Sequence, residues 1–418
     1  MNEHDSEVIA GLVEAAGYCR VEDPDQAGLV VINTCCVRGS AEQKIFGLLG
    51  RLARPGGRRL IAVGGCMAQR EGMAAFLRRR FPAVRLIFGT HALPRLPELL
   101  AKAVAGEVVV AVEEGAGRPE GLPVHRTGGV RAWVPVIYGC NNFCTYCAVP
   151  LVRGRERSRP PEAVVREVAD LARQGYREVT LLGQNVNSYG RDLGRDTNLA
   201  SLLEELNRCE GILRLRFLTS HPRDLDDGLI EAVADLDKVC EHFHLPAQSG
   251  SDRILRLMHR GYTREWYLER VRAIRKCMPG ATVTTDLIVG FPGETDQDFA
   301  DTLSLVEEAA FDGAFTFVYN TRPGTPAASI DDQVPPEVKK ERITALVEAT
   351  GRVALARNQA VVGKVVEVLV EARAPSFFGR TRGNRPVRLD GPGLAVGELR
   401  AVRIVRAGPQ ILEGEALK

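Results

Sequence analysis

Three cysteines in the stretch Gly139 to Cys147 constrain the fold and chemistry of this chain more than any other feature. Cys140, Cys144 and Cys147 stand in Cys-x3-Cys-x2-Cys spacing, directly after the apolar run Val134 to Tyr138. Cys thiolates at short spacings are the usual ligands of iron–sulfur clusters. A structural zinc site needs four ligands, and no fourth Cys or nearby His completes one here. The loop is therefore predicted to hold three irons of a 4Fe-4S cube and to leave the fourth open to a small molecule.

Composition and length place the chain among large globular proteins of a reducing compartment. Its 418 residues, 45% of them hydrophobic, suggest about three domains with sizeable cores. There is no apolar run of about 18 residues, so we expect no membrane partner. The ten Cys are unevenly spaced, unlike a secreted disulfide scaffold, which predicts a cytoplasmic location. A net charge of +2 neither favours nor excludes nucleic acid.

The amino-terminal region follows the pattern of a parallel sheet. Residues 29–33 and 60–64 are apolar runs typical of buried strands, and residues 41–52 between them are helical in pattern. Cys35 follows the first run and Cys66 follows the second. Ligands collect at the carboxyl ends of such strands, so the two thiols are expected close enough to share a metal centre. The alternative is that both are small core residues.

After the cysteine loop, strand patterns alternate with helix patterns. Together with the strand before Cys140 they predict a partial (β/α)6 barrel, whose reactions take place at the carboxyl ends of its strands. The further strands are expected at 179–182, 213–218, 242–245, 282–289 and 314–319. Polar motifs at these ends are expected to line a pocket, although each read singly is also compatible with a turn. The residues singled out there are Gly183, Gln184, Asn185, Ser220, Gln248 and Asp286.

The carboxyl-terminal region predicts a small β-barrel with a basic surface. A long charged helix at 335–359 precedes short strand patterns at 365–370, 387–389, 398–405 and 410–413. Residues 361–418 contain ten Lys and Arg against six Asp and Glu. The stretch 377–382 places two Phe residues beside two Arg residues, which suits contacts with single-stranded RNA. A barrel that only caps the fold is the alternative.

A second Arg-rich segment lies directly after the cysteine loop. Residues 153–159 contain Arg153, Arg155, Arg157 and Arg159. Such a density of positive charge fits a polyanionic substrate, whereas the alternative is a solvated turn.

The cysteine loop, read as Gly-Cys-Asn-Asn-Phe-Cys-Thr-Tyr-Cys-Ala-Val-Pro and followed by the Arg-rich segment, resembles the methylthiotransferase branch of the radical S-adenosylmethionine (SAM) enzymes. The resemblance implies that Cys140, Cys144 and Cys147 hold a cluster whose open iron binds SAM. It implies that the strand-end residues of the barrel contact SAM and that the last domain is a TRAM domain. The motifs around Cys35 and Cys66 are similar to two of the three ligand motifs of a second, auxiliary 4Fe-4S cluster.

The third of those ligand motifs precedes the position that matches Met1. We therefore expect Met1 to be an internal methionine of a longer gene, with the first strand and first auxiliary ligand encoded upstream. The alternative is that Cys36 or Cys19 replaces the missing ligand.

Residues 183–190, Gly-Gln-Asn-Val-Asn-Ser-Tyr-Gly, are most similar to the tRNA-directed members of the branch. The resemblance implies conversion of N6-dimethylallyladenosine at position 37 of tRNA into its 2-methylthio form. It also implies an anticodon stem-loop as partner, a flavodoxin- or ferredoxin-like electron donor and a monomer. The expected domains are 1–125, 126–355 and 356–418. The alternatives are a methylthiotransferase for threonylcarbamoyladenosine or a ribosomal protein, and a metal-stabilised tRNA-binding protein without catalysis.

Overall fold

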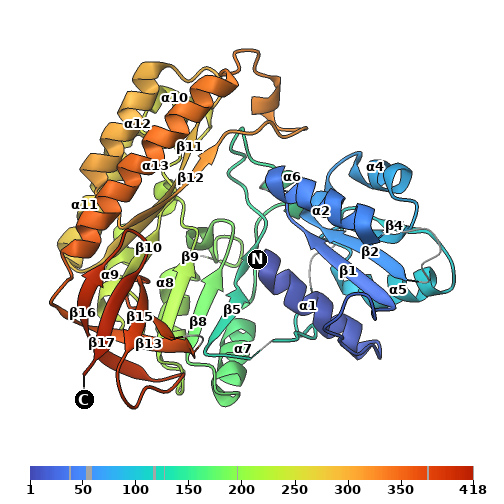
Figure 1. The fold of residues 1–418 in the computed structure, drawn as a ribbon, viewed down its shortest axis with the longest axis horizontal. Helices are drawn as coiled ribbons and strands as arrows, with labels where there is room; N and C mark the ends of the chain where they lie inside the picture. Colours follow the sequence, from blue (N-terminus) through green and yellow to red (C-terminus); the bar gives the residue numbers. More distant parts are fainter. Residues whose placement is uncertain are drawn as a thin grey trace.

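The computed structural model describes residues 1–36, 39–52, 59–115, 119–126, 128–194, 196–373 and 376–417, without the side chains of 39–41. In Figure 1 an amino-terminal sheet domain and a carboxyl-terminal barrel lie on opposite sides of a larger central domain. Among the described residues, no helix combines the length and the apolar character of a membrane span. The predicted domain boundaries at 125 and 355 stay predictions.

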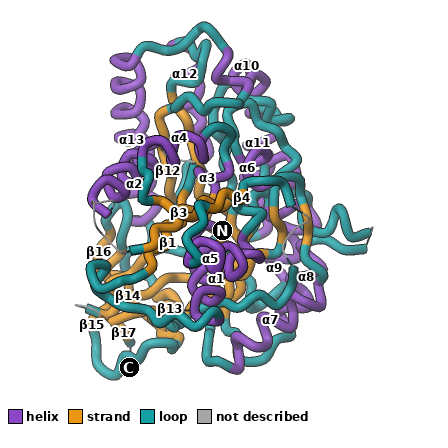
Figure 2. Tube along the Cα trace, turned by 90° about the vertical axis from the view of Figure 1, so that its right-hand side faces the viewer, coloured by secondary structure: helices purple, strands orange, loops and turns teal. Residues whose placement is uncertain are grey.

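The amino-terminal domain contains a parallel sheet in the order β1-β2-β3-β4. Its strands are β1 (Leu29–Thr34), β2 (Leu60–Gly65), β3 (Val84–Phe88) and β4 (Val109–Ala111). Its helices are α1 (Asn2–Ala15), α2 (Gly39–Leu52), α3 (Cys66–Gln69), α4 (Met73–Arg80) and α5 (Leu96–Val104). Helices α1 and α5 lie side by side in Figure 2 and share one apolar core with the sheet. The predicted β1-α2-β2 unit is confirmed, whereas β3 and β4 were not predicted.

The central domain is the predicted partial barrel. Its parallel strands form two three-stranded sheets among the described residues, in the orders β5-β8-β9 and β10-β11-β12. A bridge between Leu215 and Val239 leads from the first sheet toward the second. The strands are β5 (Arg131–Pro135), β8 (Glu178–Leu182), β9 (Arg214–Leu218), β10 (His242–His244), β11 (Thr282–Val289) and β12 (Gly313–Val318). The helices are α7 (Pro161–Arg173), α8 (Leu199–Asn207), α9 (Asp227–Asp235), α10 (Asp252–Leu257), α11 (Arg264–Cys277), α12 (Asp296–Ala309) and α13 (Pro336–Gln359).

The cysteine loop stands on a short two-stranded stem. The apolar run before Cys140 is divided into β5 and β6 (Ile137–Tyr138), and β6 pairs antiparallel with β7 (Arg157–Ser158). Gly139 begins the loop with φ +73°, and a Cβ there would lie 2.0 Å from the carbonyl oxygen of Arg155. Only glycine fits this position, because other residues would collide with backbone. Helix α6 (Val149–Arg153) follows the last cysteine.

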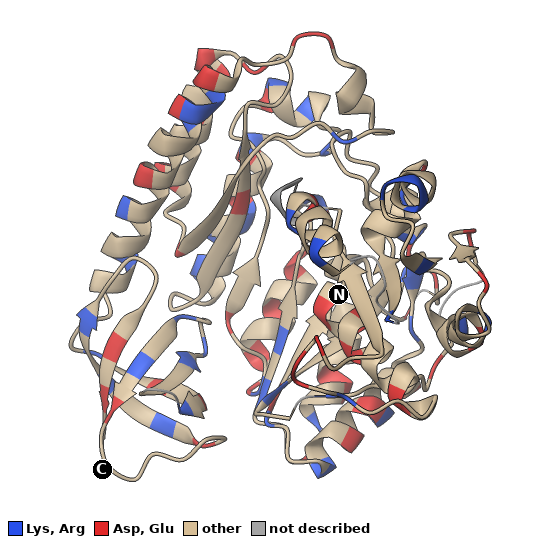
Figure 3. Ribbon diagram, turned by 45° about the vertical axis from the view of Figure 1, so that its right-hand side comes forward, with Lys and Arg blue, Asp and Glu red and all other residues tan. Residues whose placement is uncertain are grey.

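The carboxyl-terminal domain is a closed barrel in the order β13-β14-β15-β17-β16. Its strands are β13 (Val365–Arg373), β14 (Phe377–Thr381), β15 (Pro386–Asp390), β16 (Leu399–Ala407) and β17 (Leu412–Ala416). The predicted small barrel is confirmed, and it contains β14 in addition to the expected strands. Figure 3 shows Lys and Arg on several of its strands.

The turn between β14 and β15 docks against the amino ends of the central strands. Arg216, at 3% exposure, donates to the carbonyl oxygens of Arg382 at 2.6 Å and Thr381 at 2.8 Å. The hydroxyl of Thr282, the first residue of β11, donates to the carbonyl of Gly383 at 2.7 Å. The cysteine loop follows a carboxyl strand end, so the barrel is closed by this turn at the end opposite its reactive end.

Candidate functional site

The cysteine loop buries its sulfur atoms and fixes them through the backbone. Cys140 and Cys144 are buried and Cys147 is half-buried. The Cys147 N–H donates to the Cys144 carbonyl at 2.9 Å, and the Val149 N–H donates to the Cys147 sulfur at 3.4 Å. Burial raises the pKa of Cys140 to about 11 and the pKa of Cys147 to about 12. Iron binding at this loop must therefore release protons.

The donor set fits a cluster better than a single metal ion. In the part of the chain that the structure describes, no three His, Cys, Asp or Glu side chains converge on one ion site. Thiolates on one tetrahedral ion lie about 3.8 Å apart, as follows from metal–sulfur bonds of about 2.3 Å. A cubane takes one thiolate per iron and so tolerates wider spacing. Three soft sulfurs on one loop, two buried and one half-buried, are the type of ligand that such a cluster takes.

A second group of thiols lies at the carboxyl ends of β1 and β2. The strands pair with Thr34 opposite Gly65, so the residues that follow, Cys35 and Cys66, come to the same sheet end as expected. The structure also brings Cys36 there, at 2% exposure, whereas Cys35 is half-buried. A hydrogen bond between Cys36 and Cys66 raises the pKa of Cys36 and lowers that of Cys66, to about 6.

The two groups of cysteines face each other across the domain boundary. Cys36 and Cys66 share an apolar cluster with Ala148 and Val152, and Ala148 directly follows Cys147. The Thr90 hydroxyl also donates to the Val152 carbonyl. Cysteines that are far apart in the sequence are therefore brought close together.

Two residues of the Arg-rich segment hold this boundary together. Arg153, at 8% exposure, pairs with Asp5 of α1 at 2.7 Å and its charge favours the Cys66 thiolate. Arg159, equally buried, pairs with Glu120 and Glu167. The prediction of a segment free for a polyanion is therefore wrong for Arg153 and Arg159. Burying a guanidinium requires a partner, and the partners are distant in the sequence.

The predicted strand-end residues lie at the carboxyl ends of the barrel strands, except Asp286, which lies in the middle of β11. Gly183, Gln184 and Asn185 follow β8, Ser220 follows β9, Gln248 lies after β10 and Asp286 lies in β11. The Gln248 N–H donates to the Asp286 carbonyl at 2.8 Å, and the Ser220 N–H donates to the His244 carbonyl at 3.0 Å. Gly183 has a packing role, because a Cβ there would lie 2.6 Å from the Ile137 side chain.

Several polar atoms at these strand ends are buried without a partner. Among the described residues they include Asn185 Oδ1, Ser220 Oγ and His221 Nε2. Burying such atoms unpaired is costly, so a ligand that forms hydrogen bonds with them at these strand ends would gain affinity. Which of these side chains contacts SAM stays a prediction.

His221 was not singled out from the sequence. Its Nδ1 accepts from the Arg223 N–H at 3.3 Å, which leaves the proton on Nε2. Burial and the nearby Arg260 hold the pKa of His221 at about 2, so the imidazole is neutral. The only local signal was its position directly after Ser220.

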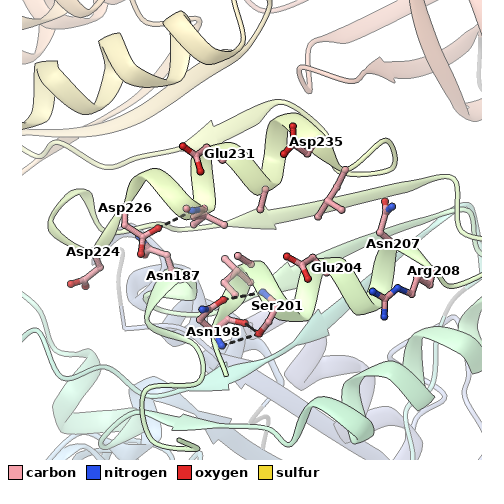
Figure 4. Close-up of a pocket in the computed structure, with 16 residues that line it drawn as sticks. Asn187, Asn198, Ser201, Glu204, Asn207, Arg208, Asp224, Asp226, Glu231 and Asp235 are labelled. Carbon is pink, nitrogen blue, oxygen red and sulfur yellow. Dashed lines mark hydrogen bonds between the residues drawn. The ribbon is translucent and has the colours of Figure 1, made fainter. Parts of the chain in front are cut away.

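Two surface pockets differ in their distance from the cysteine loop. The groove in Figure 4 lies between α8 and α9, outside the barrel, and acidic side chains such as Glu204, Glu231 and Asp235 line it. A smaller pocket of about 240 Å³ adjoins the cysteine loop. It is lined by Asn141, Asn142, Glu156, Arg191, Asp192 and Arg223.

Family models match three parts of the chain. The radical SAM superfamily matches residues 134–306, the uncharacterized protein family UPF0004 matches residues 1–89, and the TRAM domain matches residues 359–417.

Curated relatives match nearly the whole chain. A tRNA-2-methylthio-N(6)-dimethylallyladenosine synthase of Pelotomaculum thermopropionicum is 56% identical over 97% of this chain and 93% of its own length. A protein of the same name from Moorella thermoacetica is 50% identical over 99% of this chain and 96% of its own length.

Solved structures show a similar fold. The radical S-adenosylmethionine methyltransferase TsrM of Kitasatospora setae, solved with cobalamin and a 4Fe-4S cluster, has a TM-score of 0.57 at 17% identity. The match covers 78% of this chain and 71% of that one. At this identity the likeness concerns the fold alone.

Proposed function

Because this chain belongs to the family of the tRNA-2-methylthio-N(6)-dimethylallyladenosine synthases, we propose that it converts N6-dimethylallyladenosine at position 37 of tRNA into the 2-methylthio form. The observation that carries the proposal is the proximity of two cysteine groups: Cys36 and Cys66 of the sheet end pack against Ala148 and Val152, and Ala148 directly follows Cys147 of the barrel loop. One group serves a radical reaction and the other lies where a sulfur donor is needed.

The residues present fit two 4Fe-4S clusters and SAM. Cys140, Cys144 and Cys147 would hold one cluster, and Cys35 and Cys66 would contribute to the auxiliary one. Asn185, Ser220, Gln248 and Asp286, with His221, would contact SAM. When bound, these groups supply a carbon-centred radical and the sulfur that is transferred.

The chemistry of the substrate explains why acid–base residues alone do not suffice. The C2–H of adenine is far too weak an acid for a side-chain base to ionise usefully. The neutral His221 and the buried Ser220 can orient a bound ligand by hydrogen bonds without exchanging protons with it. The closed amino end of the barrel leaves the carboxyl end as the place where the base enters.

The tRNA is bound through exposed basic residues, which differ in part from those expected. Arg382 pairs with Glu241 at 2.7 Å and Arg380 with Glu371 at 3.0 Å, and both side chains are half-buried, which makes them poor candidates for RNA contact. Exposed cations of the last domain include Lys364, Arg373 and Arg403, with Arg388 and Arg406, which also pair with Glu413. Their contacts with phosphates should make tRNA binding weaken as salt rises. Position 37 lies in a loop, so turning the base out costs only a few kcal/mol.

The remaining partners follow from the same proposal. A flavodoxin- or ferredoxin-like protein supplies the electrons, the enzyme acts as a monomer, and the reaction takes place in the cytoplasm, where tRNA and reducing conditions are found. The reducing requirement of thiolate-held clusters supports this location.

The experiment is mass analysis of nucleosides from tRNA incubated anaerobically with reconstituted chain, SAM and a reductant. We expect 2-methylthio-N6-dimethylallyladenosine with the parent chain and none with Cys144→Ala. Modification of threonylcarbamoyladenosine instead would contradict the substrate assignment. Zinc in place of iron, with tRNA binding but no SAM cleavage, would identify a binding protein.

A further inference from the structure

We propose that Arg260 is a positioning residue for the cluster on the cysteine loop: its hydrogen bond to the Cys144 sulfur raises the reduction potential of that cluster. The inference rests on the proposed function, because it needs a cluster held by Cys140, Cys144 and Cys147. It concerns a side chain of the α10–α11 connection, outside every motif that the sequence suggested.

The guanidinium of Arg260 is fixed in direction by all of its nitrogen atoms. At 5% exposure, it donates from Nη1 to Cys144 Sγ at 3.3 Å and from Nη2 to the Pro246 carbonyl at 2.9 Å. Its Nε donates to the Tyr262 hydroxyl at 3.1 Å, and the Tyr262 ring lies 5.3 Å from the guanidinium carbon. Tyr262 in turn donates to the Ala247 carbonyl at 2.7 Å. The bond to sulfur is therefore part of a rigid arrangement.

The backbone around Arg260 is attached to the cysteine loop as well. The Thr145 N–H donates to the Met258 carbonyl at 3.1 Å, and the Thr145 hydroxyl donates to the Leu257 carbonyl at 2.8 Å. Thr145 directly follows Cys144. The segment 257–262 and the loop therefore move as one unit, which keeps the guanidinium against the same sulfur.

The charge of Arg260 has no carboxylate partner. Its side-chain partners within the described residues are two neutral oxygens and the Cys144 sulfur, and no Asp or Glu there forms an ion pair with it. A buried guanidinium is costly without a counter-charge. The thiolate form of Cys144, which is the form that ligates iron, supplies that negative charge.

A cation that donates to a ligating sulfur acts on the redox equilibrium of a cluster. Hydrogen bonds to the sulfurs and the net charge of the site are among the determinants of the potential. The reduced cluster carries one more negative charge than the oxidised one, so Arg260 stabilises it more. Removing the guanidinium should make one-electron reduction harder.

The test uses the full chain with Cys35→Ala and Cys66→Ala, so that only the loop cluster contributes to the signal. Arg260→Gln, Arg260→Lys and the control Arg264→Gln are reconstituted anaerobically with iron and sulfide. Redox titration without SAM is followed by electron paramagnetic resonance. Arg264 is a matched control, because its guanidinium bonds Asp301 and Ser304 of α12 and not the loop.

We expect Arg260→Gln to lower the equilibrium constant for reduction at least tenfold, which is 59 mV for one electron. The reduction potential of Arg260→Lys should lie between those of Arg260→Gln and the parent chain. The potential of Arg264→Gln should equal that of the parent chain. An unchanged potential for Arg260→Gln at equal iron content overturns the inference. A fall in SAM affinity alone, with the SAM-free potential unchanged, does the same and makes Arg260 a SAM ligand.

Loading failures are also decisive. If Arg260→Gln binds no iron, the reduction potential is measured on Arg260→Lys instead. If neither binds iron although circular dichroism remains native, Arg260 is required for loading and the tuning role is overturned. A parent chain without iron contradicts the proposed function, whereas a loaded parent with an unshifted Gln variant contradicts only this inference.

Discussion

Two buried polar atoms at the strand ends are the candidates for direct contact with SAM. Ser220 Oγ and His221 Nε2 are buried and unpaired, although both residues are otherwise held by backbone bonds. An unpaired buried polar atom costs about 1–3 kcal/mol, so a ligand that pairs with it gains affinity. The proton on Nε2 makes His221 a donor, which suits a carboxylate or hydroxyl of SAM.

We expect His221→Ala to weaken SAM binding about tenfold, because one hydrogen bond is worth about 1–1.5 kcal/mol. Equilibrium dialysis with the iron-loaded chain measures this. His221→Asn should keep part of the affinity, because an amide can donate from a similar place. Unchanged binding in His221→Ala would show that the imidazole faces no ligand.

The Cys36–Cys66 pair predicts a pH-dependent reactivity in the metal-free chain. The pKa of Cys66 is lowered to about 6, so its thiolate predominates above that pH. Alkylation of Cys66 by iodoacetamide, followed by peptide mass analysis, should therefore reach half its maximal rate at a lower pH than that of an ordinary thiol. In Cys36→Ala the stabilising donor is lost, and the midpoint should move upward, toward that of an ordinary thiol. Cys36→Ser keeps a donor and is the control; equal midpoints in all three chains would contradict the pairing.

Among the elements, the stem of the cysteine loop depends most on one residue. Gly139→Ala would place a Cβ against the Arg155 carbonyl at a left-handed φ. Such strain costs about 1–3 kcal/mol, and β6 and β7 would separate at the base of the loop. We expect the variant to lose the iron of that loop, measured as iron per chain.

Gly175→Ala is the matched control for this substitution. Gly175 also has a positive φ, at +93°, but a Cβ there has nothing within 4 Å. This variant should load iron as the parent does. Equal iron in Gly139→Ala and Gly175→Ala would show that the stem does not govern the loop.

The sequence predicted elements well where periodicity and order suffice. The apolar runs at β1, β2 and β8 are correctly placed because buried parallel strands are apolar on both faces. Strands β9, β10 and β11 contain Arg, His or Thr, and their alternation with helix patterns placed them. Strand β14 was missed because Phe377 to Thr381 resembles an RNA-contact motif and contains Gly379. The roles of Arg153 and Arg159 were not predictable, because Asp5 and Glu120 are 148 and 39 positions away.

At the scale of the whole molecule, the turn at residues 381–385 attaches the carboxyl-terminal domain firmly to the central domain. Arg216 pairs with Glu178 at 2.9 Å, both nearly fully buried, while also holding the turn. The central and carboxyl-terminal domains should therefore unfold together. The exposed basic residues of the last domain then keep a fixed direction relative to the central domain.

Arg216→Met should destabilise this unit by about 3–5 kcal/mol, because Glu178 would be left as an unpaired buried charge. Urea unfolding followed by circular dichroism measures the change. Arg406→Gln, at a side chain 77% exposed, should change stability by less than about 0.5 kcal/mol. Two separate transitions in the parent chain would contradict the rigid docking.

The most direct test of the account is iron and sulfide analysis with electron paramagnetic resonance on anaerobically reconstituted chain. The account predicts a reduced 4Fe-4S signal that SAM perturbs, and its loss when Cys140, Cys144 and Cys147 are together replaced by Ala. A chain without a cubane signal, or a SAM-perturbed signal that survives the triple replacement, would contradict it.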